Sequence, residues 1–197
     1  MRVQLKDVRL LFAKNLFVAS KPRTAAADAK LKYQFEGLIE PGSANDKLLR
    51  DAILAVADEK TKGRGAEKLK QIAAAGNIWT LRDGDLRVDD KGDTRPEYKG
   101  KLVVSAKNEV RPLVIGPQRE PLTLEDGRLY SGCFTNVIMD VQVGDKPKWQ
   151  VYAYLLGVQF ARDGDRIGAG VAAADDFDAL PQAEAAKTAS AGAAGLF

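Results

Sequence analysis

The chain has 197 residues, with 30 lysines and arginines, 27 aspartates and glutamates, one cysteine and no histidine. This length predicts one main domain of roughly 150 residues plus a tail, large enough to bury a core without disulfides. The lack of histidine excludes every histidine-dependent triad and removes the commonest general base and metal ligand. The single Cys133 excludes an internal disulfide and a multi-cysteine zinc site. We therefore expect no cofactor.

The net charge of +3 is distributed unevenly. Six acids and two bases follow Arg162, so this end carries −4 and the first 162 residues carry the remaining +7. A basic body attracts polyanions, and an acidic tail competes for the same surface. No apolar run is long enough to span a bilayer, and the first ten residues lack a signal-peptide core. These features indicate a cytoplasmic protein without a membrane partner.

Strand-like and helical patterns alternate in the first half of the chain. Val3–Phe12 and Leu31–Glu40 read as strands, separated by a basic, alanine-rich loop over 19–30. Apolar residues then recur at i, i+3 and i+4 from Asn45 to Val56, which predicts a helix. A second, shorter helix is predicted from Ala66 to Ala75. We expect the two helices to cover one end of a barrel.

The middle of the chain contains one further strand. Asn77–Tyr98 is turn-rich and highly charged and reads as a loop, Gly100–Ala106 as a third strand, and Arg111–Pro121 as a crossover punctuated by prolines. The sequence Arg-Asp-Gly-Asp occurs at 82–85 and again at 162–165. Because Asp-Gly favours tight turns, the repeat is most simply two turns of one chemical type.

A long hairpin forms the centre of the predicted fold. Two strand-like runs, Cys133–Val143 and Lys148–Ala161, flank a short turn that contains glycine and proline. Successive side chains of a strand point to opposite faces, so the second run has one polar, aromatic face and one mostly apolar face. The first face carries Lys148, Gln150, Tyr152 and Tyr154, and the second carries Trp149, Val151, Ala153 and Leu155.

Together these elements predict a mainly β (α+β) fold. We expect a five-stranded OB-type barrel with two helices inserted between strands 2 and 3, a fold often used to bind single strands. The barrel domain is assigned to residues 1–167. Residues 168–197 are expected to form a disordered acidic tail rich in alanine and glycine, because they offer too little apolar bulk to offset their ordering entropy.

Seven sequence pieces occur in order along the chain: VRLLFA, KYQFEGLI, LRDGD, EYKGKLVVSA, LYSGCF, VQFARDGD and DDFDAL. In this order they resemble the OB-fold single-stranded-DNA-binding protein family of tailed bacteriophages, over about residues 1–180. The resemblance implies a protein without catalytic activity that binds single-stranded DNA with little sequence preference. It also implies a role in phage DNA replication or recombination, in the cytoplasm of the host cell.

Sequence-tolerant binding of single strands needs flat rings for the bases and cations for the phosphates. The ring candidates are Tyr33, Trp79, Tyr98, Tyr152 and Tyr154. Core packing is favoured for Tyr33, which shares its face with Phe35 and Ile39, whereas DNA contact and core packing are equally supported for the two tyrosines of the hairpin. The exposure of the other two rings is left open. Phosphate contacts are expected from a group of basic residues: Lys6, Arg9, Lys14, Lys32, Lys99, Lys101, Lys107, Arg111 and Lys148.

The acidic tail is expected to serve partner proteins of replication or recombination. Its residues Asp175, Asp176 and Asp178 would mimic DNA phosphates on the empty groove, and Phe177 or Phe197 would dock into the partner. Simple solubilisation is the alternative. The oligomeric state, including a homodimer, is left open.

Two other functions compete with DNA binding. A structural or protein-interaction module would keep the fold and use the groove for a peptide or virion partner, since fold does not fix function. A metal-dependent nuclease would need several converging carboxylates, such as those of Asp83/Asp85 or Asp89/Asp90. These acids are interleaved with turn residues and no histidine base is present, so the nuclease is the weaker alternative.

Overall fold

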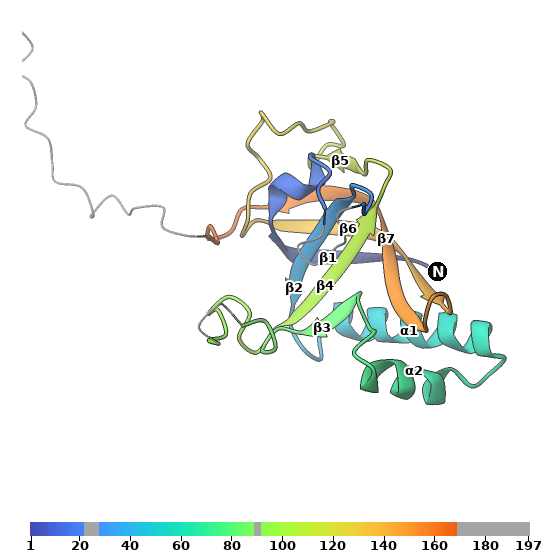
Figure 1. Cartoon of the computed structure of the whole chain (residues 1–197). Coiled ribbons are helices and arrows are strands. Elements are labelled where there is room, and N and C mark those ends of the chain that lie inside the picture. Colours follow the sequence, from blue (N-terminus) through green and yellow to red (C-terminus); the bar gives the residue numbers. More distant parts are fainter. Residues whose placement is uncertain (22–27, 89–91, 169–197) are drawn as a thin grey trace, which may run out of the picture. The chain divides into compact units, whose positions relative to one another are not determined.

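A sheet of seven strands forms the body of the protein in the computed structural model, which describes residues 1–21, 28–88 and 92–168 (Figure 1). In chain order the elements are β1 (Arg2–Leu11), the 3₁₀ helix η1 (Ala13–Leu16), β2 (Tyr33–Ile39), α1 (Ala44–Thr61), α2 (Gly65–Ala74), β3 (Leu81–Asp83), β4 (Leu102–Asn108), β5 (Leu113–Ile115), β6 (Phe134–Gly144) and β7 (Gln150–Arg162). The prediction of five strands is therefore wrong. It missed β3 and β5, whose three residues each are too few to show an alternating pattern.

The strands lie in the order β3-β4-β2-β1-β6-β7-β5. Neighbours in this order pair antiparallel, except for β5, which runs parallel to β7. An additional parallel pairing joins β4 to β7, where Lys107 lies opposite Tyr154. This pairing connects two strands that stand second and sixth in the order. It therefore brings the two halves of the sheet together.

The hairpin of β6 and β7 confirms the predicted alternation. Val151, Ala153 and Leu155 are buried, whereas Tyr152 is half-buried and Tyr154 is exposed. The same pattern continues on β2, where Phe35 is 1% exposed and Tyr33 packs against the core, as favoured by the sequence. One face of the sheet packs on the hydrophobic core, and the opposite face, which we call the outer face, carries Tyr152 and Tyr154.

Both helices lie between β2 and β4, which correspond to the second and third predicted strands. Figure 1 shows the helices side by side at one end of the sheet. The Ser43 hydroxyl accepts a bond from the Asp46 N–H at 3.3 Å, and this cap begins α1. Helix α1 ends at Lys62, which adopts a left-handed conformation with φ of 55° ahead of Gly63. Its apolar stripe packs against β1 and β6.

Residues Met1–Ile167 form one compact unit. Apart from Gly168, the predicted tail lies outside the described residues, as do its named members Asp175, Asp176, Phe177, Asp178 and Phe197. Within the described part of the chain, no helix has the length and apolarity needed to cross a membrane.

Replacing Phe35 by alanine tests the assignment of the core. The ring is almost fully buried, so its removal leaves a cavity, and we expect the free energy of unfolding to fall by about 3–5 kcal/mol. Leu86→Ala is the matched control, because Leu86 is 78% exposed, and it should change stability by less than about 0.5 kcal/mol. Urea unfolding measures both. Equal effects of the two variants would contradict the assignment.

Candidate nucleic-acid interface

The outer face of the sheet brings β2, β4 and β7 together in one row. Residues directly opposite one another on paired strands share a face. Gln34 on β2 lies opposite Lys107 on β4, and Lys107 lies opposite Tyr154 on β7. An amide, an amine and a phenol ring therefore stand side by side, although their strands come from distant parts of the sequence.

Three aromatic rings gather at the β7 side of this face. Tyr152 and Tyr154 have ring centroids 5.4 Å apart and meet edge to face, with an interplanar angle of 86°. Burial raises the pKa of the Tyr152 hydroxyl, and the adjacent Tyr154 raises it further. Trp79 lies beside the start of β7, because its backbone N–H donates to the Val151 carbonyl at 2.8 Å. Trp79 and Tyr154 are each 43% exposed, so both rings are partly open to solvent.

Three cationic side chains gather around a single carboxylate on the same face, and one of them, Lys107, lies opposite Tyr154. On β3, Arg82 Nη2 donates to the Ser105 hydroxyl of β4 at 3.1 Å. Arg87, in the loop after β3, donates from Nη2 to Glu36 Oε2 of β2 at 2.7 Å. With Lys107, these two arginines form a group that we call the outer cation cluster.

The charges of this cluster act on one another. Although the Lys107 side chain reaches solvent, partial burial lowers the pKa of its amine, and the Arg82 guanidinium lowers it further while Glu36 raises it. Burial also lowers the pKa of Arg82, and the next cause is the neighbouring Arg87. The positive charges are thus close enough to repel one another and are only partly balanced by Glu36.

The structure brings several of the predicted contact residues together and leaves others apart. Those on or beside the outer face of β2, β4 and β7 are Lys32, Trp79, Lys107, Tyr152 and Tyr154. Arg9 lies further along the same face, on β1 opposite Leu38, and donates to the Asp165 carbonyl at 3.1 Å. Lys148 is exposed just before β7.

The remaining predicted cations lie elsewhere. Lys101 forms an ion pair with Glu40. The Lys6 backbone forms hydrogen bonds with the side chain of Asn45, in the first turn of α1. Lys14 belongs to η1, Lys99 to the loop before β4, and Arg111 to the link between β4 and β5. These five are spread over separate elements, so nothing in the structure joins them to the rings.

Tyr98 requires a correction. It is only 4% exposed and belongs to a small apolar cluster with Leu11, Leu38 and Val103. The loop before β4 folds this ring back onto the sheet, where its hydroxyl donates to Glu36 Oε1 at 3.5 Å. The ring face is therefore closed to a base. Tyr98 instead helps to hold Glu36 in place.

Sequence reasoning missed Arg82 and Arg87 because their segment was interpreted as a charged loop. The only local indication was the position of Arg82 directly after the apolar Leu81, which is too short a pattern to establish a strand. The acids of the same segment are occupied in turns: Asp83 Oδ1 accepts from the Asp85 N–H at 3.0 Å, and Asp85 Oδ1 accepts from the Gly100 N–H at 2.8 Å. Asp89 and Asp90 lie outside the described residues. The described ones contain no cluster of three or more acidic, histidine or cysteine residues that could hold a metal ion.

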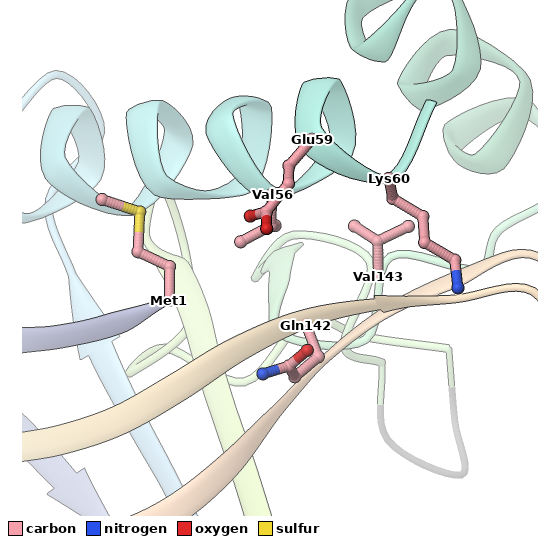
Figure 2. A pocket seen from close by; sticks show the side chains of 6 residues that line it. All are labelled: Met1, Val56, Glu59, Lys60, Gln142 and Val143. Carbon is pink, nitrogen blue, oxygen red and sulfur yellow. The ribbon is translucent and has the colours of Figure 1, made fainter. Parts of the chain in front are cut away.

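A pocket of about 480 Å³ lies between α1 and β6 (Figure 2). Its lining is Met1, Val56, Glu59, Lys60, Gln142 and Val143. The figure shows Glu59 and Lys60 descending from α1 toward the strand. Lys60 Nζ lies 3.6 Å from the carboxylate of Asp145, so the basic side chain of this lining is already paired. The pocket lacks the aromatic rings of the outer face and is not the nucleic-acid site we assign.

Comparison with known proteins gives a family match over most of the chain. The model of the family described as Enterobacter phage Enc34, ssDNA-binding protein, matches residues 1–188. Protein p50 of Acyrthosiphon pisum secondary endosymbiont phage 1 is 39% identical over 188 residues, which cover 93% of this chain and 96% of that protein. The resemblance inferred from the ordered sequence pieces is confirmed.

Two of the solved structures that the chain resembles are phage proteins. The single-stranded DNA-binding protein from bacteriophage Enc34, in complex with ssDNA, is matched with a TM-score of 0.64 and 23% identity, over 85% of this chain and 89% of that one. The gp2.5 protein, a single-stranded DNA-binding protein encoded by bacteriophage T7, is matched with a TM-score of 0.50 and 12% identity, over 89% of this chain and 92% of that one. At these identities the matches establish a shared fold.

Titration of the tyrosines tests the burial of Tyr98 beside Glu36. Burial, followed by the charge of Glu36, raises the pKa of Tyr98 to about 12, above the usual value of about 10. The folded protein therefore keeps this proton at a pH at which the unfolded chain has lost it. Its contribution to the free energy of unfolding is complete below about pH 10 and is lost between about pH 10 and 12. In a spectrophotometric titration, Tyr98→Phe should lose one late-ionising tyrosine that Tyr154→Phe retains; Tyr152, whose pKa is also raised, contributes to the late step that remains. A late step of undiminished amplitude in Tyr98→Phe would contradict this placement.

Proposed function

Because the chain belongs to the family of the Enterobacter phage Enc34 ssDNA-binding protein, we propose that it binds single-stranded DNA with little sequence preference, in phage DNA replication or recombination. The observation that carries this proposal is the row on the outer face in which Tyr154 stands opposite Lys107. Rings and cations there lie within reach of one nucleic-acid strand. The protein acts by binding and not by catalysis, in the cytoplasm of the host cell.

Each part of the outer face has a role in this proposal. The rings of Trp79, Tyr152 and Tyr154 stack on unpaired bases, and stacking tolerates any sequence because every base has a flat face. The outer cation cluster, together with Lys32 and Lys148, neutralises phosphates. The amide of Gln34 lies beside Lys107 on the side away from Tyr154. Its Nε2 donates to the Ser20 hydroxyl at 2.9 Å, and its Oε1 can accept a bond from a base.

We also assign the fold to the OB type. Five of the strands, β4, β2, β1, β6 and β7, follow one another in the sheet, and the β4–β7 pairing links the two ends of this series. That arrangement supports a small closed barrel with β3 and β5 as additions at its rim. In an OB fold, the outer face of such a barrel and the loops around it hold single strands.

The acidic end of the chain is proposed to regulate this surface. Residues 168–197 contain four acids, Asp175, Asp176, Asp178 and Glu184, and one base, Lys187. Negative charge tethered to a basic body competes with DNA for the same cations. Displaced by DNA, the segment with Phe177 and Phe197 is then available to a replication or recombination protein.

The rings are tested by two double variants. Tyr152→Ala with Tyr154→Ala should weaken binding to a poly-dT oligonucleotide, at about 1–3 kcal/mol for each base that loses its stacking partner. Tyr152→Phe with Tyr154→Phe keeps the ring faces and should bind like the wild type. Fluorescence anisotropy measures affinity, and thermal unfolding confirms that each variant is folded. Unchanged affinity of a folded alanine variant would refute the ring contacts and favour a protein-interaction module.

The tail is tested by truncation and by neutralisation. A chain that ends at Gly170 should bind poly-dT more tightly than the full chain, because the competing carboxylates are gone. The full-length variant with Asp175→Asn, Asp176→Asn and Asp178→Asn is the matched control and should reproduce most of the gain at low salt. If truncation leaves the affinity unchanged or lowers it, the tail does not occupy the DNA-binding surface.

A further inference from the structure

The outer cation cluster holds more positive charge than its surroundings neutralise. Arg82, Arg87 and Lys107 surround one carboxylate, that of Glu36, while the neighbouring Lys32 is within 3.7 Å of Glu109. Glu36 Oε2 forms a direct ion pair with Arg87 alone. Among the described residues, two positive charges of the cluster therefore have no carboxylate of their own.

The hydrogen bonds of the two arginines are also incomplete. The Nε atoms of Arg82 and Arg87 are shielded from solvent and have no acceptor, and Arg82 uses only a neutral hydroxyl, that of Ser105, through Nη2. A guanidinium carries five N–H donors in a planar fork that matches an anion with several oxygens. The cluster thus has donors in excess of the acceptors that the described residues supply.

A purely structural role does not explain this composition. One arginine would be enough to pair Glu36, and each further cation adds repulsion and a desolvation penalty. Charges that cost stability in the free protein are typical of binding sites, where a ligand supplies the missing opposite charge. The ligand indicated here is a compact anion with several acceptor oxygens.

We propose that Arg82, Arg87 and Lys107 form a preformed subsite for a single backbone phosphate of the bound strand, with Glu36 as the positioning residue that fixes Arg87. This inference rests on the proposed single-stranded-DNA-binding function and specifies where one phosphate is held. Lys107 lies directly opposite Tyr154, so a nucleotide whose base stacks on this ring brings its phosphate to the cluster. The subsite thereby sets the register of the strand relative to the rings.

Glu36 acts through Arg87 and not by contact with DNA. Its two oxygens engage different partners, Arg87 Nη2 at 2.7 Å and the Tyr98 hydroxyl at 3.5 Å. Tyr98 is anchored in its apolar cluster, so the carboxylate is held from behind and the guanidinium is held in turn. A cation fixed before binding loses less conformational entropy when the phosphate arrives.

The test compares Lys107→Gln and Arg82→Gln with Lys47→Gln, which removes an exposed lysine from α1. Affinity for poly-dT is measured at several salt concentrations. We expect each cluster variant to bind about tenfold more weakly at low salt and to have a shallower dependence of log affinity on log salt concentration. The slope should fall by at most about 0.7, the value for one whole phosphate contact with a single strand. The control should keep the affinity and slope of the wild type.

Stability without DNA separates this role from a structural one. Because Lys107 is repelled by its neighbours in the free protein, Lys107→Gln should melt at the same temperature as the wild type or above it, while it binds DNA more weakly. A structural lysine would show the reverse, with a lower melting temperature. Loss of stability in Lys107→Gln would overturn the proposal.

A single neutral linkage locates the phosphate. One methylphosphonate is moved along the shortest oligonucleotide that binds, and the wild type should lose affinity most strongly at one position. Lys107→Gln should lose less affinity at that position than the wild type does, because one of the three cations that hold the phosphate is already missing. Equal sensitivity at every linkage, or the same positional loss in both proteins, would overturn the subsite.

The outcomes distinguish this inference from the function on which it rests. A wild-type protein that fails to bind poly-dT refutes the proposed function. A wild-type protein that binds, while both cluster variants match it in affinity and salt slope, refutes the subsite alone and leaves the function intact.

Discussion

The parallel pairing of Lys107 with Tyr154 is the constraint on which the proposed site depends. The rings come from β7 and from Trp79 beside it, whereas the cations come from β3, β4 and the loop after β3. In the order of the sheet, β4 and β7 are separated by three strands. The rings and the cations form one surface only because β4 pairs with β7. Core packing beneath this contact, with Ala106 on one strand and Leu155 on the other, is therefore a condition of function as well as of stability.

The outer face combines two opposing electrostatic demands. A surface that attracts a polyanion must concentrate positive charge, but neighbouring cations repel one another and lose hydration when they are partly buried. Glu36 reduces this conflict without removing it, because one carboxylate stands among three cations. Elsewhere on the protein the charges are more nearly balanced, as in the pairs of Lys101 with Glu40 and Arg162 with Asp7. Exposed pairs of that kind contribute about 0–1 kcal/mol to stability. The outer cation cluster differs from them because one carboxylate faces three cations.

The sequence predicted best where a short-range pattern extends over many residues. Strand β7 has 13 residues, long enough for its period of two to separate Tyr152 and Tyr154 from the buried Val151 and Leu155. Helix α1 was predicted from its apolar spacing, and Ser43 caps it in the structure. In both cases the information lies within the element itself.

Prediction failed where a residue's environment is set by a distant segment. Tyr98 was a candidate ring whose exposure the sequence left open, but Glu36, 62 residues earlier, and the apolar cluster around Val103 bury it. Arg82 belongs to a strand of three residues that exists because β4 is beside it. No local pattern reveals such a partner, so the arginines of the outer cation cluster could be recognised only in three dimensions.

The geometry of the two hairpin tyrosines bears on why an unpaired strand would be preferred. Their rings meet at 86°, so bases stacked on both faces in this arrangement cannot remain parallel to each other. Neighbouring bases of a duplex are parallel and hidden between base pairs, and separating them costs a few kcal/mol per step. A flexible single strand turns its bases at a much lower cost. Within the proposed function, the crossed rings therefore disfavour paired DNA by shape, and they do so without reading any base edge, which is consistent with sequence tolerance.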